Sequence, residues 1–157
     1  MNFSKKAALA AFLYLPWLFA QSNMLNIAPP AKVAAKRGAG VEARVKVALQ
    51  HGYHVNSNTP TEDYLIPLRL TWEQGALQAA GVVYPKPRNE KYAFSEKPLS
   101  VFTGSFDLVS RFKVAPNAPP GPGILLGKLR YQACNDKACF PPKTVEVRLP
   151  YEISPAR

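Results

Sequence analysis

Cysteine, histidine and acidic residues are all scarce in this chain of 157 residues. Two cysteines and two histidines leave few ligands for a metal ion, and we expect neither a metal nor a cofactor. Lysine and arginine number 20 against 10 acidic residues, which gives a formal net charge of +10. The basic residues are scattered, without the clustered stripe typical of nucleic-acid-binding proteins. The composition therefore predicts a solvated basic surface and no nucleic-acid partner.

Long apolar runs are also lacking, and the one that stands out covers residues 7–20, directly after Lys5 and Lys6. Its 14 residues are fewer than a membrane-spanning helix needs. A basic start, a short apolar run and the small residue Ala20 are typical of a secretory signal peptide. We expect residues 1–20 to be cleaved off and the remainder to be a soluble exported, periplasmic protein. A retained N-terminal anchor is the alternative.

The remaining sequence divides into a tail and one domain. Residues 21–40 show no hydrophobic period and contain Pro29 and Pro30, which predicts a flexible tail. A folded domain is predicted over residues 41–157. Within it, apolar and polar residues alternate in segments typical of half-buried strands: 41–49, 64–72, 79–84, 106–114, 125–131 and 145–151.

No segment of this domain has a convincing helical period, and the 16 prolines of the chain fit strands joined by turns. Seven or eight short strands with turn signals between them predict an all-β fold. We expect an immunoglobulin-like antiparallel β-sandwich.

The two cysteines, Cys134 and Cys139, enclose the polar, turn-forming sequence Asn-Asp-Lys-Ala. One strand ends near Ala133 and another begins after Pro142, so the pair is predicted at the tip of a β-hairpin. Opposite residues there come within the separation of about 4.4–6.8 Å that a disulfide needs. In an oxidising compartment we expect the Cys134–Cys139 disulfide to form.

The size of this loop leaves two functions open. A disulfide that closes six residues stabilises the fold by about 2 kcal/mol, against roughly 4 kcal/mol for a loop of about 100 residues. Local or exposed disulfides are also the ones that exchange most readily. Spacing alone does not separate a structural disulfide from a redox-active one.

The residues around the cysteines carry a resemblance. The sequence Tyr131-Gln-Ala-Cys134, followed by Cys139-Phe-Pro-Pro142, resembles the active-site hairpin of the N-terminal periplasmic domain of the DsbD family. That family typically has Tyr-Gln-x-Cys, a short variable loop, and Cys-aromatic-Pro-Pro. Further segments match in the expected order, at residues 51–55, 83–85 and 101–104. The resemblance extends over about residues 41–151.

The resemblance implies a redox-active module that relays reducing equivalents between thioredoxin-like proteins and disulfide isomerases. A membrane thiol transporter would be the source of the electrons, and the module itself would be a monomer. Cys139 would form the mixed disulfide with partners, and Cys134 would resolve it. Phe102 would be an aromatic cap that shields the sulfur pair and moves when a partner docks.

Three other side chains are expected around the cysteines. Tyr131 and Phe140 flank them, and as strand residues they fit packing better than catalysis. His54 near the sulfurs would lower a thiol pKa. His51 and His54 could also join the cysteines in a zinc or copper site, although nothing in the spacing enforces that geometry. The alternatives to exchange are therefore a non-enzymatic interaction module with a structural disulfide and, less well supported, a metal carrier.

Overall fold

The computed structural model describes residues 24–155, which contain strands and turns but no helix. In this part of the chain, no helix is long and apolar enough to cross a membrane. The predicted signal peptide lies outside the described residues. The predicted all-β fold is confirmed, and the strands form three four-stranded sheets.

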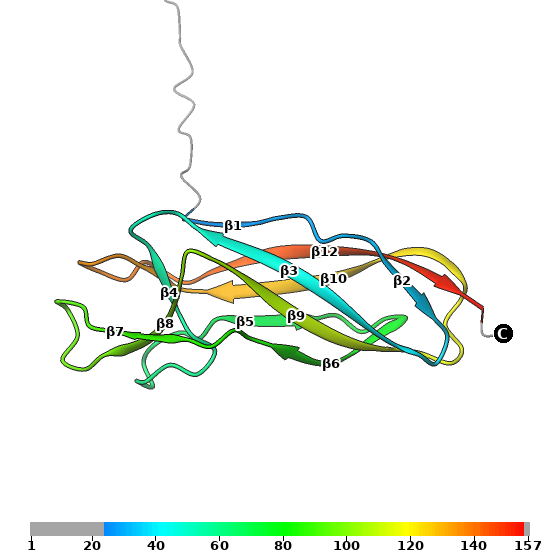
Figure 1. Ribbon diagram of the computed structural model, residues 1–157, viewed down its shortest axis with the longest axis horizontal. Helices are drawn as coiled ribbons and strands as arrows, with labels where there is room; N and C mark the ends of the chain where they lie inside the picture. The colour runs from blue at the N-terminus through cyan, green and yellow to red at the C-terminus, as the bar shows by residue number, and fades with distance from the viewer. Residues whose placement is uncertain (1–23, 156–157) are drawn as a thin grey trace, which may run out of the picture.

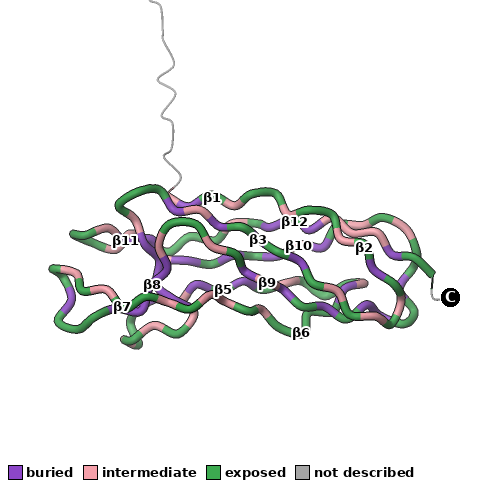
Figure 2. Tube along the Cα trace, viewed as in Figure 1, coloured by how far each residue is buried: buried purple, intermediate pink, exposed green. Residues whose placement is uncertain are grey.

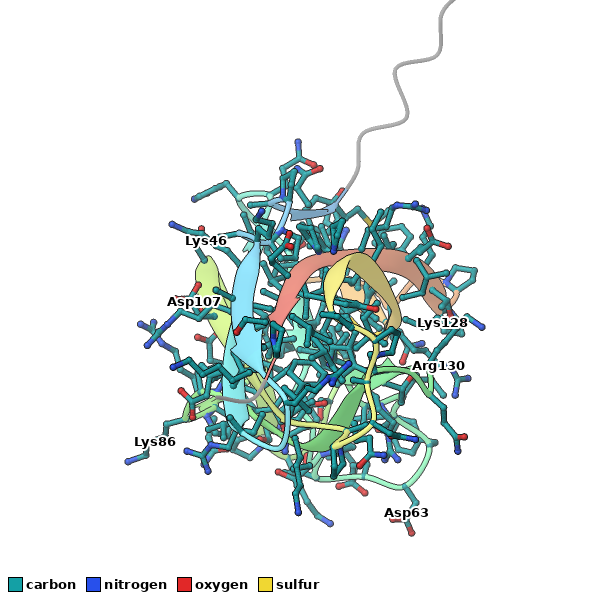
Figure 3. The ribbon with its side chains drawn as sticks, turned by 90° about the vertical axis from the view of Figure 1, so that its right-hand side faces the viewer. Lys46, Asp63, Lys86, Asp107, Lys128 and Arg130 are labelled. Atoms are coloured by element: carbon teal, nitrogen blue, oxygen red, sulfur yellow. A yellow bond between two sulfur atoms is a disulfide. The ribbon has the colours of Figure 1, made fainter. Side chains whose placement is uncertain are left out.

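The first sheet has the order β1-β3-β9-β6, and all its neighbours are antiparallel. Its strands are β1 (Leu25–Ile27), β3 (Gly40–Leu49), β9 (Ser105–Val114) and β6 (Leu77–Val83). The two longest, β3 and β9, are the segments in which the sequence alternates most strictly. Lys46 and Asp107 project from the outer face of this sheet (Figure 3).

The second sheet has the order β2-β12-β10-β5 and packs on the first to form the sandwich (Figure 1). Its strands are β2 (Val33–Lys36), β12 (Lys143–Ser154), β10 (Gly121–Tyr131) and β5 (Arg69–Trp72). Its pairs are antiparallel except β2 and β12, which run parallel. Lys128 and Arg130 of β10 point to solvent on the far side from Lys46 (Figure 3).

The third sheet is smaller and lies at the end of the sandwich opposite the C-terminus (Figure 1). We call it the end sheet, and its order is β11-β4-β8-β7. Its strands are β11 (Ala133–Cys134), β4 (His54–Asn56), β8 (Leu99–Thr103) and β7 (Arg88–Glu90). It contains one of the two cysteines and therefore sets the surroundings of the disulfide.

The core lies between the two large sheets, where period-two alternation turns every second side chain inward. Val45, Leu108, Leu129 and Leu149 have no exposed surface, and they come from β3, β9, β10 and β12. Burying each such side chain stabilises the fold by roughly 1.5–3 kcal/mol. Buried and exposed positions alternate along the long strands (Figure 2).

The prediction of a flexible tail up to residue 40 is wrong for the described residues from 24 onward. Within this segment β1 pairs with β3 of the first sheet, and β2 pairs with β12 of the second. Leu25 and Ala35 are buried in the core. Strands of three and four residues are too short to show a hydrophobic period, and Pro29 and Pro30 lie where the chain crosses between the sheets. The domain therefore includes residues that precede its predicted start at Val41.

The alternation predicted over residues 64–72 holds only for its second half. Strand β5 begins at Arg69, and Tyr64, expected on the buried face, is 72% exposed. Residues 62–68 instead form a turn and a loop, in which the Leu65 amide donates to the Glu62 carbonyl and the Leu68 amide to the Ser57 carbonyl. Pro67 lacks the N–H that a continuous strand would use here.

Candidate functional site

The two cysteines form a disulfide in the connection between β10 and β12, which we call the cysteine loop (residues 132–142). Cys134 and Cys139 lie directly opposite each other in an antiparallel bridge, as predicted for a hairpin tip. Their Cα atoms are 3.9 Å apart, closer than predicted. The bridge is flanked by the bonds Phe140 N–H to Ala133 O (2.8 Å) and Asn135 N–H to Ala138 O (2.9 Å). This is the non-hydrogen-bonded type of pair, in which opposite Cα atoms approach most closely.

The two sulfur-bearing residues differ in exposure. Cys134 is fully buried, whereas Cys139 is partly exposed. Cys139 begins the part of the cysteine loop that leads back to β12, which we call the return limb (residues 139–142). The turn between the two cysteines is exposed, and Asn135 holds it by accepting hydrogen bonds at Oδ1 from the amides of Lys137 and Ala138, both at 2.9 Å. Of the two residues, Cys139 is therefore the one with surface in contact with solvent.

The register of the end sheet decides which side chains surround Cys134. Cys134 lies opposite His54, and His54 lies opposite Thr103, so these three side chains share one face. His54 was expected near the sulfurs, and this register brings it next to Cys134. Directly opposed side chains on one face have Cβ atoms about 4.5–5.5 Å apart.

The same register places Phe102, the predicted cap residue, on the other face of the end sheet. Phe102 lies opposite Val55, and Val55 lies opposite Ala133, so these three share the other face. Phe102 is only 3% exposed and packs in the core, with its ring centroid 5.0 Å from that of Phe106. It is therefore a core residue and not a cap over the sulfur pair. Tyr131, at the end of β10, is a core residue as well.

A different pair of aromatic residues stacks on His54, the residue opposite Cys134. The Tyr92 ring stacks on His54 with a centroid distance of 3.9 Å, and Phe94 stacks on Tyr92 at 5.6 Å. The Tyr92 hydroxyl donates to Glu90 Oε2 at 2.8 Å. Phe94 is 40% exposed, so the stack runs from the buried His54 to the surface. The ring centroid of Phe140, the residue after Cys139, lies 6.0 Å from that of Tyr53.

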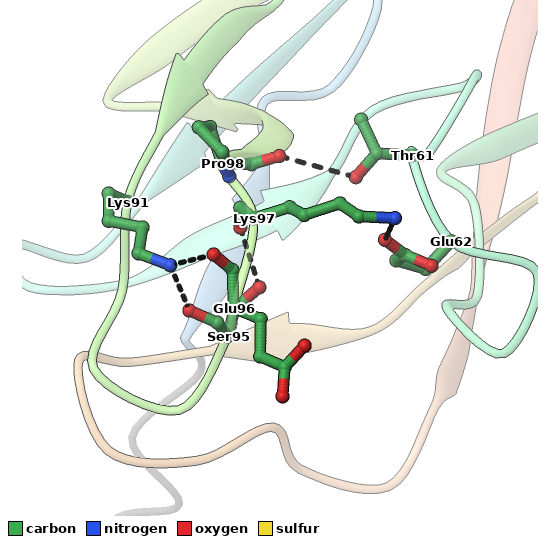
Figure 4. Close-up of polar contacts among 7 residues, drawn as sticks. All are labelled: Thr61, Glu62, Lys91, Ser95, Glu96, Lys97 and Pro98. Carbon is green, nitrogen blue, oxygen red and sulfur yellow. Dashed lines mark hydrogen bonds and ion pairs between the residues drawn. The ribbon is translucent and has the colours of Figure 1, made fainter.

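Tyr92 and Phe94 belong to the connection between β7 and β8, which we call the cover loop (residues 91–98). Lys91 holds this loop closed by donating from Nζ to the carbonyls of Ser95 and Glu96 (Figure 4). An ion pair of 3.4 Å between Lys97 and Glu62 ties it to the neighbouring loop. The cover loop could not be identified from a sequence pattern, because its residues do not alternate as those of a strand do. The one signal in its sequence is the presence of two aromatic residues within a short polar segment.

Burial controls the charge state of the covered residues. Loss of water lowers the pKa of His54 to about 4, although the nearby Glu90 carboxylate acts in the opposite direction. His54 is therefore neutral at pH 7, and its Nε2 is buried without a hydrogen-bond partner. Burial, together with the Glu90 hydrogen bond and charge, raises the pKa of Tyr92. Burial also raises the pKa of Tyr131.

A cleft of about 350 Å³ opens beside these residues. Its walls come from the turn after β3, the cover loop and the cysteine loop, and they include His51, Tyr53, Glu90, Tyr92 and Asp136. Both histidines line it, but in residues 24–155 no three His, Cys, Asp or Glu side chains are grouped to hold a metal ion. The site thus combines a disulfide, a neutral histidine, an aromatic stack and this cleft, which is lined by His54 and Tyr92.

A comparison with protein families identifies the family of the chain. Residues 22–150 match the family described as thiol:disulfide interchange protein DsbD, N-terminal. No protein among those with curated functions matches the chain.

Two solved structures resemble the fold. The N-terminal periplasmic domain of ScsB from Proteus mirabilis has a TM-score of 0.54 and 13% identity; the alignment covers 80% of this chain and 44% of that one. The reduced DsbD N-terminal domain of Neisseria meningitidis has a TM-score of 0.48 and 19% identity, with 78% and 83% covered. This chain therefore spans less than half of the ScsB chain that it resembles.

Proposed function

Because the chain belongs to the family of N-terminal domains of the thiol:disulfide interchange protein DsbD, we propose that it is a thiol–disulfide exchange module that works in the periplasm after export. The observation that carries this proposal is the unequal exposure of the two cysteines. A partly exposed Cys139 beside a buried Cys134 is the arrangement that a two-step exchange reaction requires. A disulfide with a purely structural role needs no such difference.

Reduction of the module begins when a thiolate of a donor attacks Cys139 Sγ. The Cys134–Cys139 bond breaks, Cys134 leaves as a thiolate and takes up a proton, and a mixed disulfide joins Cys139 to the donor. A second donor thiolate then attacks the donor sulfur of this mixed disulfide, and Cys139 is released reduced. The donor pair is oxidised and the module carries two electrons.

Delivery follows the same path in reverse. The Cys139 thiolate attacks the disulfide of an acceptor, which forms a new mixed disulfide and releases an acceptor thiolate. Cys134 then loses its proton and attacks Cys139 Sγ, so that the internal disulfide forms again and the acceptor leaves as a dithiol. The partners that suit this chemistry are thioredoxin-like proteins and disulfide isomerases, with a membrane thiol transporter as the source of electrons.

In this proposal the cover loop takes the protective role that the family resemblance had implied for Phe102. Tyr92 and Phe94 shield the Cys134 face, and the stack ends at the surface, where a docking partner would meet it. The loop is closed by hydrogen bonds, by one ion pair and by the packing of Tyr92 on His54 and on a small apolar cluster that includes Leu99. None of these contacts belongs to the core between the large sheets, so opening of the loop costs less than unfolding of the sandwich.

Trapping of mixed disulfides tests the proposal. The variant Cys134→Ala, incubated with an oxidised thioredoxin-like protein, is expected to accumulate a covalent complex through Cys139, because the resolving thiol is missing. The matched variant Cys139→Ala should form little complex, since its remaining thiol is buried.

Two results would count against exchange. One is the absence of a complex with Cys134→Ala, and the other is a complex that forms equally well with both variants. If, in addition, reduction of the wild-type protein strongly lowered its melting temperature, the disulfide would be structural and the chain an interaction module.

A further inference from the structure

Gln132, the first residue of the cysteine loop, makes three hydrogen bonds with its side-chain amide. Its Oε1 accepts from the Asn56 side-chain N–H and from the Ile66 backbone N–H, both at 3.3 Å. Its Nε2 donates to the backbone carbonyl of Phe140 at 3.2 Å. One side chain thus ties three segments of chain together: strand β4, the loop before β5, and the return limb of the cysteine loop.

The partners of Gln132 are themselves fixed. Asn56 is fully buried in the end sheet, and its Nδ2 also donates to the Ile66 carbonyl at 3.0 Å. Gln132 therefore connects Phe140, the residue directly after Cys139, to a rigid part of the fold. The residue directly before Cys134 is held as well, because the Ala133 carbonyl accepts from the Phe140 amide.

The cysteine loop is consequently held closed by two independent systems. One is the disulfide, which disappears each time the protein is reduced. The other consists of the Phe140–Ala133 backbone bond, the Asn135 turn and the Gln132 amide, none of which involves sulfur. The second system does not depend on the disulfide bond, so it is available in the dithiol form, when nothing covalent keeps the cysteines together.

We propose that Gln132 is a positioning residue that keeps Cys139 next to Cys134 after reduction and so speeds the closure of the disulfide. This inference rests on the proposed exchange function and deepens it. The bond from Nε2 to the Phe140 carbonyl limits the motion of the Cys139 backbone. A confined thiol pair has a higher effective concentration than a mobile one, and ring closure is correspondingly faster.

The step affected is the second half of oxidation. With glutathione disulfide as the oxidant, the Cys139 thiolate first attacks one glutathione sulfur and releases one glutathione thiolate. Cys134 then loses its proton to solvent and attacks Cys139 Sγ, which breaks the bond to the second glutathione. Two protein thiols become one disulfide, and glutathione disulfide becomes two glutathione molecules. Gln132 acts on the intramolecular attack and not on the first step.

Two variants separate the contacts of Gln132. Gln132→Ala removes all three hydrogen bonds. Gln132→Glu retains oxygen acceptors for Asn56 and Ile66 but has no N–H to donate to the Phe140 carbonyl. Gln78→Ala, a change of an exposed glutamine on β6, is the matched control. The reduced full-length proteins are mixed with glutathione disulfide, and the glutathionylated intermediate and the closed disulfide are followed by quenched mass spectrometry.

We expect ring closure to slow by about five- to tenfold in both Gln132 variants, because both lose the one hydrogen bond to the Phe140 carbonyl. Formation of the intermediate, measured in a Cys134→Ala background, should stay within about twofold of its rate with Gln132 present, and Gln78→Ala should behave as wild type. Closure of Gln132→Glu at the wild-type rate would overturn the proposal, as would equal slowing of both steps. Glutathione replaces the protein partner, so failure to trap a partner leaves this test intact.

Discussion

The end sheet and the sandwich differ in what they bury. Within residues 24–155, five of the six buried polar residues belong to the end sheet or its connections: His54, Asn56, Ser57, Ser95 and Ser100. The sandwich contributes only Ser110, which accepts a hydrogen bond from the Trp72 indole at 2.9 Å. Among the described residues, both buried side-chain atoms without a partner, His54 Nε2 and Asn56 Oδ1, are in strand β4.

This contrast shows that the end sheet is the part of the molecule that departs from a well-packed apolar interior. An unpartnered buried polar atom costs free energy, and natural proteins retain such atoms mostly where a function requires them. The sandwich is a scaffold whose stability comes from apolar burial. The interior of the end sheet, next to the cysteines, is less favourable in free energy because it contains these unpartnered polar atoms. Four changes test this division, from the largest expected effect to the smallest.

The first change removes apolar volume from the sandwich. Leu129→Ala leaves a cavity in the core between the large sheets, where the side chain has no exposed surface. We expect the free energy of unfolding to fall by about 3–5 kcal/mol in urea denaturation. The rate at which Cys139 forms mixed disulfides in folded protein should be unchanged. A loss of that rate would show that scaffold and site are not separable.

The second change concerns pH at the end sheet. His54 has a pKa of about 4 when folded and about 6.5 when unfolded, so between these values the unfolded chain binds a proton that the folded one does not. Stability should therefore be full above about pH 7 and fall as the pH drops toward 4, by at most about 3 kcal/mol. Urea titrations of wild type and His54→Phe across this range measure it. Equal slopes in both proteins would contradict the assignment.

The third change is reduction of the disulfide. Because the bond closes a loop of only six residues, its removal should lower the free energy of unfolding by about 2 kcal/mol, less than the loss of one core leucine. Urea denaturation of the oxidised protein and of the reduced protein with unmodified thiols gives the difference in the free energy of unfolding. A loss above about 4 kcal/mol would favour a structural disulfide over an exchanging one.

The fourth change compares one buried polar contact in each region. Ser57 Oγ and Ser100 Oγ lie 2.8 Å apart in the end sheet region. A double-mutant cycle of Ser57→Ala and Ser100→Ala should give a coupling of about 1 kcal/mol. Ser110→Ala leaves the Trp72 indole N–H without its partner and should cost a similar amount. If either the coupling energy or the cost of Ser110→Ala were much larger, the region that contains that contact would depend on polar contacts more than the composition of its buried residues indicates.

The long strands of the sandwich could be predicted from the sequence because each buries one face. Strands β3 and β9 have ten residues each, and their alternation is visible without knowledge of their partners. Strands β1, β2 and β11 have two to four residues and are held by pairing with distant segments. Pairing of that kind leaves no local pattern, which is why residues 24–40 looked like a tail.

The site was predictable in its covalent part only. The cysteines and their hairpin follow from spacing and flanking residues. His54 does lie opposite Cys134, but it is neutral at pH 7 and so lacks the positive charge with which it was expected to lower a thiol pKa. The exchange of roles between Phe102 and Tyr92 could not be foreseen. Which face of β8 meets the disulfide depends on the register between β4, β8 and β11, and a shift by one residue reverses it. Register is a property of three paired segments and not of any one of them.

The parallel pair of β2 and β12 has a consequence for the order in which the chain can fold. It joins the beginning of the ordered domain to its end: Ser154 Oγ donates to the Ala35 carbonyl across 119 positions of sequence. When the chain emerges with its N-terminus first, β2 has no strand to pair with until the last residues of the domain have emerged. Contacts of such long range slow folding, and unpaired strand edges in the meantime favour association between chains. Completion of the fold therefore waits for β12, the last strand of the described residues.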